Sequence, residues 1–187
     1  AEKSRDEAQR GQPTPGANDG GSGVGLFLAL GDLLRSTPPS LGVDLLFVDG
    51  EDYGQFGPDV DVLIGATWFA AHLPSVNYQP LFGVLFDMVG DADLRIKQEE
   101  HSLTRAPEVV ERVWTAAAAL GYADVFTAQT IYPITDDHLT LLDKGLRVID
   151  VIDLDYPYHH TVEDTIDKVF ARSLKIVGDV AWRLLQR

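Results

Sequence analysis

Three short apolar runs constrain the fold of this chain more than any other feature. They are VDLLFVD at 43–49, PLFGVLFDMVG at 80–90 and RVIDVID at 147–153. Each run is rich in β-forming residues and is apolar on both faces of the strand it would make. Strands of that kind are typical of parallel sheets covered by helices, so the runs predict a layered α/β fold with a largely parallel sheet.

Helical patterns separate these runs along the chain. We expect helices at about 23–35, 61–73, 106–122, 138–145 and 164–186. Residues 1–22 are polar and hold several Pro and Gly residues, so we expect a loop there, with Ser22 as the N-cap of the first helix. The chain shows no internal repeat and no second linker, which indicates one domain over residues 1–187.

Composition narrows the possible functions. The chain has 187 residues, 45% of them hydrophobic, which suits a globular domain with its own core. Its net charge of −14 makes nucleic acid an improbable partner, because phosphate binding depends on Lys and Arg. The sequence contains no Cys, which excludes disulfides, thiolate zinc sites and Cys nucleophiles. No apolar run reaches the roughly 18 residues of a membrane span, and nothing indicates an oligomeric state.

Acids and histidines gather where the expected strands end. Glu51 and Asp52 follow the first strand, Asp87 ends the second, His159 and His160 follow the third, and Asp19 precedes the first helix. In α/β folds, sites form just past the carboxyl ends of the strands. Close carboxylates repel unless a cation holds them. Asp, Glu and His without Cys suit a catalytic zinc, which keeps one coordination position open.

Glu51 and Asp52 are neighbours in sequence and cannot easily do the same work. One of them can bind a metal while the other faces the bound water, and a glutamate in that place moves protons during the reaction. Taken one at a time, each acid also has an ordinary explanation. Paired acids in a loop are commonly solvated, and an Asp at a strand end often caps a turn or helix.

The glycine-rich stretch GANDGGSGVG at 16–25 admits three interpretations. It can be a flexible linker, a phosphate-binding loop, or a tight turn that directs the side chain of Asp19. No expected strand directly precedes the glycines, and the G-x-G-x-x-G spacing is not met in that context, which disfavours the phosphate-binding loop.

Five motifs in a fixed order carry a family resemblance. They are GANDGGSGVG, FVDGEDYG, LFDMVGD, DDHLTLLDKG and YHHTVEDT. Together they resemble the M28 family of zinc peptidases, whose superfamily also contains the animal-type glutaminyl cyclases, and the resemblance runs from about residue 11 to near the end of the chain. It implies a three-layer α/β/α fold with a mostly parallel mixed sheet, of the zinc exopeptidase (phosphorylase/hydrolase-like) type.

The resemblance also implies a role for each residue that matches a motif, with one or two Zn²⁺ ions as cofactor. Asp19 matches a metal ligand that bridges two zinc ions in the peptidases, so the glycines around it serve a turn that aims it. Asp52 matches the next ligand, commonly Glu in the family, and His160 matches the last one. Glu51 matches the general acid/base. Asp87 matches a second-zinc ligand in the two-zinc peptidases and a proton-network residue in the cyclases.

One part of the family pattern has no counterpart. M28 peptidases carry a His in an H-x-D motif on a strand before the glycine-rich loop, and no His precedes Asp19 here. The chain opens at Ala1 within a polar stretch, and no signal segment is visible. We therefore expect an N-terminally truncated domain whose first strands and this His lie outside the chain. The resemblance implies a periplasmic or extracellular location.

Two reactions at peptide N-termini fit this resemblance. An aminopeptidase would hydrolyse the first peptide bond, with Glu51 moving the proton. A glutaminyl cyclase would let the amine of an N-terminal Gln attack its own side-chain amide and release ammonia, again with Glu51 transferring the proton. A third possibility is a member of the same fold that has lost its chemistry, against which the retained acids and His160 argue.

Two positions bear on the choice between these reactions. Asp136, in the D-D-H run at 136–138, is similar to a cyclase residue that joins the acid–base network, although related peptidases keep an Asp-His there. His159 stands where cyclases usually have Trp, and Asp150 stands where they have another His. The substrate-binding residues that we expect are His138, Tyr158 and His159. On balance the sequence slightly favours a zinc aminopeptidase over a cyclase.

Overall fold

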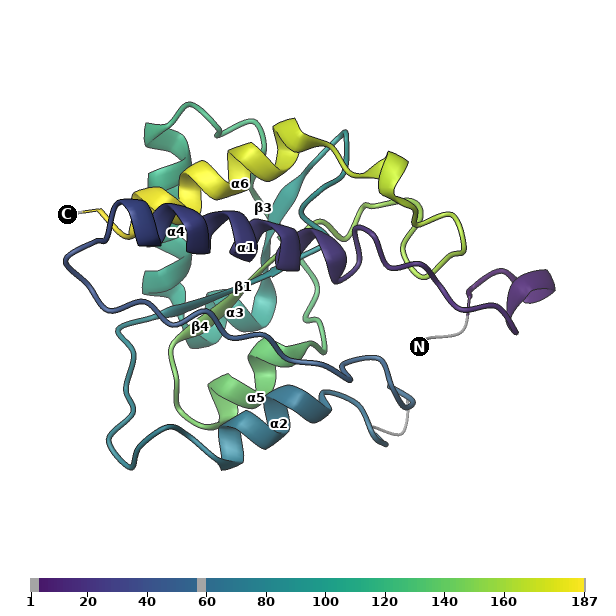
Figure 1. Ribbon diagram of the computed structural model, residues 1–187, viewed down its shortest axis with the longest axis horizontal. Coiled ribbons are helices and arrows are strands. Elements are labelled where there is room, and N and C mark those ends of the chain that lie inside the picture. Colours follow the sequence, from purple (N-terminus) through teal and green to yellow (C-terminus); the bar gives the residue numbers. More distant parts are fainter. Residues whose placement is uncertain (1–3, 57–59, 187) are drawn as a thin grey trace.

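The computed structural model describes residues 4–56 and 60–186 (Figure 1). Its helices are α1 (Gly21–Ser36), α2 (Ile64–Ala71), α3 (Glu100–Arg105), α4 (Pro107–Ala119), α5 (Asp137–Asp143) and α6 (Ala171–Leu184), with 3-10 turns η1 (Glu7–Gln9) and η2 (Ile166–Lys168). Its strands are β1 (Gly83–Asp87), β2 (Ile96–Glu99), β3 (Phe126–Ile131) and β4 (Val148–Ile152).

The strands pair in parallel, as the apolar runs predict. β1 pairs with β4 from Gly83 opposite Val148 to Asp87 opposite Ile152. β2 pairs with β3 in the same sense, with an irregularity between Ile96 and Gln98. Because β1 and β4 end side by side, the loops that follow them start from the same edge, where the acids and histidines were expected to meet.

Helices cover both sides of the paired strands, in agreement with the predicted layering. Figure 1 shows α1 and α6 on one side of β1 and β4, and α2 and α5 on the other. All five residues of β4 are buried, so this strand packs on both faces. Residues of one apolar cluster come from α1, β2, α4, β3, α5, β4 and α6, while Met88, Ile152 and Tyr156 form a smaller second cluster beside the strand ends.

The predicted strand at 43–49 is wrong. This segment is irregular in the structure, because a strand needs a ladder partner for its backbone groups and no described segment provides one. Its apolar residues pack instead on α1, with the ring of Phe47 edge-on to Phe27 at 5.7 Å. Directly after it, the carbonyls of Asp49 and Gly50 accept from the first residues of α2.

The start of α1 also differs from the prediction. The helix begins at Gly21 within the expected loop, and its N-cap is Gly20, whose φ of +83° suits glycine. Ser22 lies inside the helix, where its hydroxyl donates to the Asn18 carbonyl at 2.6 Å and accepts from the Val89 N–H at 3.0 Å. Ser22 therefore fastens α1 to the residues after β1 and caps nothing.

The expected helix at 164–186 is broken in two. η2 ends at Lys168, Val169 and Phe170 are extended, and α6 starts at Ala171. The Phe170 N–H donates to the Gly90 carbonyl at 2.8 Å, so this backbone bond to the β1 loop replaces a helical one. β2 and β3 were not predicted, because their sequences IKQE and FTAQTI are too polar to read as buried strands.

Within residues 4–56 and 60–186, every helix is too short or too polar to cross a membrane.

Candidate functional site

Two carboxylates converge on one imidazole where three loops meet. Asp19 precedes α1, Asp52 follows the 43–49 segment, and His160 lies in the loop after β4. The His160 Nε2 atom is 3.2 Å from the Asp19 Oδ2 atom and 3.3 Å from the Asp52 Oδ2 atom. The structure thus brings together Asp19, Asp52 and His160, the three residues that the family resemblance marks as metal ligands in peptidases and cyclases alike.

A buried acid fixes the backbone that carries Asp19. Asp164 accepts from the Asn18 N–H at 2.9 Å and from the Asp19 N–H at 3.0 Å. The Tyr156 hydroxyl donates to the same carboxylate at 2.6 Å. The Asn18 side chain in turn accepts from the Gly90 N–H at 2.7 Å. These bonds tie the glycine-rich turn to both strand-end loops and therefore set the direction of Asp19.

Close packing explains one glycine of this stretch. A Cβ atom on Gly23 would lie 2.3 Å from the carbonyl oxygen of Phe86, the residue before Asp87. Only glycine lets α1 approach β1 this closely, and that approach puts Asp19 beside the end of the strand. The turn that aims one side chain is thus the interpretation of GANDGGSGVG that the packing supports.

Two residues at the site have left-handed backbones. His160 has a φ of +57° and Met88, which follows Asp87, has a φ of +49°. Such values are uncommon outside glycine and cost roughly 1–3 kcal/mol each unless the surroundings enforce them. Strain of this kind concentrates where a side chain must point in one particular direction.

The residues present fit a zinc ion. Two ligands about 2.0–2.1 Å from one tetrahedral zinc lie about 3.4 Å apart, close to the distance from His160 Nε2 to one oxygen of Asp19 and to one of Asp52. Ligand atoms of Asp19, His159 and His160 also lie within 4.8 Å of one another, so His159 is a further candidate ligand. The buried Asp52 Oδ1 atom has no hydrogen-bond partner among the described residues. Imidazole nitrogen and carboxylate oxygen are both zinc ligand atoms, and three protein ligands are the number that a catalytic zinc takes.

Glu51 and Asp87 stand beside this set and favour their protonated forms. Burial, with the charges of Asp87 and Asp52, raises the pKa of Glu51 to about 10. Burial and the charge of Asp19 raise the pKa of Asp87 to about 8, although the N–H groups of Met88 and Gly20 act to lower it. A bound cation would lower both values. Carboxyls so placed can hold and release protons.

Asp136 and Asp137 extend this group of acids. Asp136 is the N-cap of α5, where it accepts from the Asp137 N–H at 2.5 Å. Burial, then the charges of Asp150 and Glu51, raise the pKa of Asp136 well above its usual range. Burial and the charge of Asp52 raise the pKa of Asp137 to about 6. Asp136 is therefore electrostatically coupled to Glu51.

His159 lies next to the set, whereas Tyr158 faces a cavity that none of the three residues lines. The His159 Nε2 atom is 3.9 Å from the Asp19 Oδ2 atom, and its ring centroid is 3.8 Å from that of His160. Burial, with the charges of His160 and Arg5, lowers the pKa of His159 to about 4. Tyr158 packs on Tyr156 and lines a cavity of about 550 Å³, with the ammonium of Lys168 over its ring.

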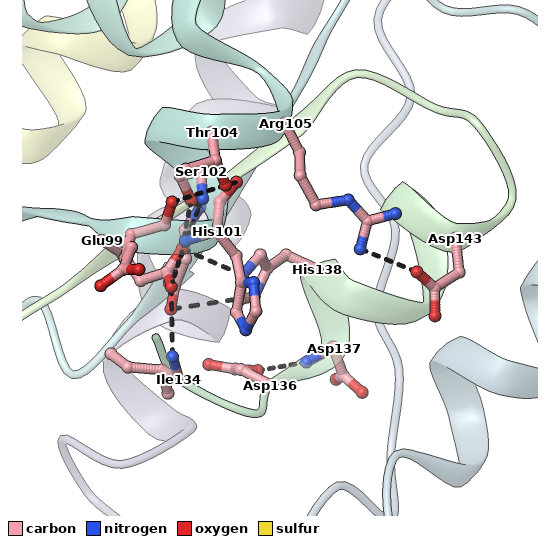
Figure 2. Close-up of polar contacts among 12 residues, drawn as sticks. Glu99, His101, Ser102, Thr104, Arg105, Ile134, Asp136, Asp137, His138 and Asp143 are labelled. Carbon is pink, nitrogen blue, oxygen red and sulfur yellow. Dashed lines mark hydrogen bonds and ion pairs between the residues drawn. The ribbon is translucent and has the colours of Figure 1, made fainter. Parts of the chain in front are cut away.

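His138 has surroundings of a different kind. Its side chain is fully buried, with the Nε2 atom 3.3 Å from the Glu99 Oε2 atom (Figure 2). Its Nδ1 atom is 3.9 Å from the Asp150 Oδ2 atom. A substrate-binding role for His138 would require the residues around it to move. The donor atoms of Asp136, His138 and Asp150 lie within 4.8 Å of one another and form a second acid–histidine group.

Sequence reasoning missed Glu99 and Asp164 and gave Asp150 no role. Glu99 is the N-cap of α3 and accepts from Ser102, but its E-x-x-S order is the reverse of the usual capping box and gives no clear signal for this helix. Asp164 lies within the YHHTVEDT motif, but nothing in the sequence shows that it accepts from the backbone of the distant Asn18.

The comparisons with known proteins agree with this geometry. Residues 5–185 match the profile described as Peptidase family M28. The chain is 32% identical to a Zn-dependent exopeptidase from Parabacteroides distasonis, with a TM-score of 0.92 over 98% of this chain and 68% of that one. It is 35% identical to a glutaminyl cyclase from Tannerella forsythia, with a TM-score of 0.89 over 97% of this chain and 67% of that one.

A curated relative points in the same direction. The chain is 26% identical over 184 residues to the aminopeptidase YwaD of Bacillus subtilis, covering 89% of this chain and 36% of that protein. The chain thus spans about a third of this relative and about two thirds of the similar structures. Since the family profile matches nearly the whole sequence, this chain belongs to peptidase family M28.

Proposed function

We propose that this chain carries a zinc-dependent site that cyclises N-terminal glutamine of peptides and proteins. The observation that carries the proposal is the surroundings of Asp87, whose carboxyl lies near the N–H groups of Met88 and Gly20 and close enough to Glu51 to raise its pKa. Between backbone N–H groups and another acid, Asp87 suits the proton network of a cyclase better than the ligand set of a second zinc ion. The similarity to glutaminyl cyclases of known structure supports the same choice.

The chain's own residues account for the proton movements of this reaction. Asp19, Asp52 and His160 would hold a zinc ion, which would polarise the side-chain amide carbonyl of the substrate. Glu51 would take a proton from the attacking N-terminal amine and give it to the departing ammonia. Asp87 and Asp136, both coupled to Glu51, would keep that carboxyl oriented and buffer its charge. His159 and Tyr158 would contact the substrate.

Hydrolysis of the first peptide bond is the second candidate. The observation that favours it is His159, a polar ring against Asp19 in the position where cyclases usually have an apolar Trp. A titratable imidazole is a less apolar contact surface for the methylene groups of a glutamine side chain than an indole ring. The similarity to an exopeptidase and an aminopeptidase is consistent with this alternative.

One mass-spectrometric experiment separates the candidates. Zinc-loaded protein is incubated with a short peptide that begins with Gln and with one that begins with Leu. Loss of ammonia from the Gln peptide, with the chain intact, supports cyclisation. Removal of the first residue from either peptide supports the aminopeptidase, and no change in either peptide, with zinc bound, supports a non-catalytic member of the fold. The periplasmic or extracellular location stays a prediction.

A further inference from the structure

A fully buried pair, Glu99 and His138, lies behind the proposed acid–base network. Glu99 ends β2 and His138 is in the first turn of α5, and neither side chain is exposed. Figure 2 shows Glu99 reaching toward the His138 ring from the start of α3, with Asp136 below that ring in this view. A buried carboxylate against a buried imidazole is costly unless hydrogen bonds satisfy the remaining oxygens of the carboxylate.

The partners of Glu99 show that it is an ionised acceptor. The Oε1 atom accepts from the N–H groups of His101 at 2.7 Å and Ile134 at 3.1 Å. The Oε2 atom accepts from the N–H of Ser102 at 2.6 Å and from its hydroxyl at 2.8 Å. Burial alone would raise the pKa of Glu99, but the nearby His138 ring and the donors of His101 and Ser102 outweigh it and bring the pKa to about 2.

This acceptor determines which nitrogen of His138 carries the proton. Nε2 lies 3.3 Å from Glu99 Oε2, although the approach is too oblique for a well-formed hydrogen bond. An unprotonated Nε2 would present its lone pair to a carboxylate, which is repulsive, so the hydrogen belongs on Nε2. In a neutral ring Nδ1 is then an acceptor, and it faces Asp150.

Asp150 is connected to Glu99 by two routes. The first runs through His138, whose Nδ1 atom is 3.9 Å from the Asp150 Oδ2 atom. The second runs through Ser102, whose hydroxyl donates to Glu99 and accepts from the Asp150 N–H at 3.0 Å. Neither side-chain oxygen of Asp150 has a hydrogen-bond partner among the described residues. Burial, then the charges of neighbouring acids, raise the pKa of Asp150 well above its usual range.

We propose that Glu99 is a positioning residue that fixes His138 as the Nε2–H tautomer, so that Nδ1 orders the Asp150–Asp136 pair behind Glu51. A neutral Asp150 donates toward this lone pair, and a small rotation of its side chain closes the gap. Asp136 then keeps one orientation toward Glu51. The effect on turnover rests on the proposed function, whereas the tautomer of His138 does not.

The tautomer is measured directly by ¹⁵N NMR on the full, zinc-loaded chain. The chain has five histidines, and His138 is assigned by the signals that His138→Gln removes. We expect a protonated Nε2 and an unprotonated Nδ1. A protonated Nδ1, alone or together with Nε2, would overturn the proposal. This measurement needs neither turnover nor a stable Glu99 variant, so it decides the proposal even if the enzyme proves to be inactive.

A pair of variants tests the consequence for turnover. In Glu99→Gln the new amide NH₂ group faces donors where the carboxylate accepted hydrogen bonds, so we expect His138 to lose its single tautomer. We expect kcat to fall about 10-fold or more, with KM and zinc content unchanged. The control is His101→Gln, whose ring centroid is 6.5 Å from that of His138 and whose side chain is outside the two routes. We expect wild-type kcat from it. A fall in kcat with the tautomer intact would overturn the positioning role.

Metal analysis covers the remaining alternative for the same residues. Asp136, His138 and Asp150 are spaced so that they could also share a cation. One outcome would be a second zinc ion per chain that is lost in His138→Gln but retained in Asp52→Asn. That result would replace the proton-ordering role with a metal site. Zinc at no more than one ion per chain, released by Asp52→Asn alone, is the result expected from the proposal.

Discussion

The protein holds two groups of acids around a histidine, and they differ in exposure more than in composition. In the outer group the exposed fractions are 11% for His160, 14% for Asp19 and 20% for Asp52. In the inner group, Glu99, His138 and Asp150 are all 0% exposed and Asp136 is 4% exposed. The same side-chain types therefore have different uses, because a group that solvent reaches can take a cation and a substrate, whereas a sealed group is left to arrange protons.

Backbone geometry separates the two groups as well. The outer group depends on strained or glycine-dependent positions, namely the left-handed His160 and Gly20. The inner group sits on regular elements, with Glu99 capping α3, Asp136 capping α5 and Asp150 inside β4. Loops that carry ligands can adjust to what they bind, while helix ends and a buried strand hold a fixed arrangement.

The largest expected effect comes from removing the shared ligand of the outer group. His160→Gln should weaken zinc binding by more than about 100-fold and abolish turnover, because two carboxylates lose their common partner. Metal content after dialysis measures the loss. His72→Gln is the control, since His72 caps the exposed end of α2. Equal zinc content in His160→Gln and wild type would remove the distinction drawn between the two groups.

Glu51→Gln should separate metal binding from proton transfer. We expect zinc content to stay at the wild-type level while kcat falls about 10²- to 10⁴-fold, the usual contribution of a general acid/base. Metal analysis and steady-state kinetics on the same preparation check both parts. Comparable activity in this variant would refute the role of Glu51. Loss of zinc would indicate that Glu51 belongs to the ligand set.

Gly23→Ala tests whether the close packing of α1 on β1 positions Asp19 in the outer group. The added Cβ would lie 2.3 Å from the Phe86 carbonyl, which forces α1 away from β1 and should cost about 1–3 kcal/mol of the free energy of unfolding. Zinc affinity should fall with it, because Asp19 moves with the helix. Gly25→Ala is the matched control, since its Cβ would meet nothing within 4 Å and alanine favours a helix. Chemical denaturation of both variants, with and without zinc, gives the comparison.

The sequence predicted the outer group far better than the inner one. Asp19, Asp52 and His160 lie in motifs with a recognisable order, although only the loop of His160 follows a strand of the structure. Glu99 lies in IKQEEHS, a polar stretch that resembles a surface loop, and only the pairing of β2 with β3 buries it. No local pattern predicts which distant donors a buried carboxylate will meet.

The same limit explains the errors in the fold. The segment 43–49 has the composition of a strand, but pairing depends on a partner that local sequence cannot supply. The α6 region has helical periodicity throughout, and a single backbone bond from Phe170 to Gly90 was enough to break it. Ser22 has the right chemistry for an N-cap, yet its hydroxyl is used to join α1 to Val89. In each case a long-range contact overrode a correct local preference.

The smallest expected effect tests whether burial alone, without a histidine, raises the pKa of an acid here. Asp153 follows β4, is fully buried and accepts only the N–H groups of Arg95 at 3.1 Å and Asp155 at 3.2 Å among the described residues. Burial raises its pKa to about 7, despite these two donors. Between the unfolded pKa of about 4 and that value, the folded chain binds more protons than the unfolded chain.

The free energy of unfolding should therefore fall as pH rises through this window, by about 1–3 kcal/mol from Asp153. Urea unfolding at several pH values between 4 and 8 measures the slope, and Asp153→Asn should remove this part of it. An unchanged slope in the variant would mean that other acids carry the pH dependence. The inner group would then be the first place to look, because its raised pKa values have the same sign of linkage.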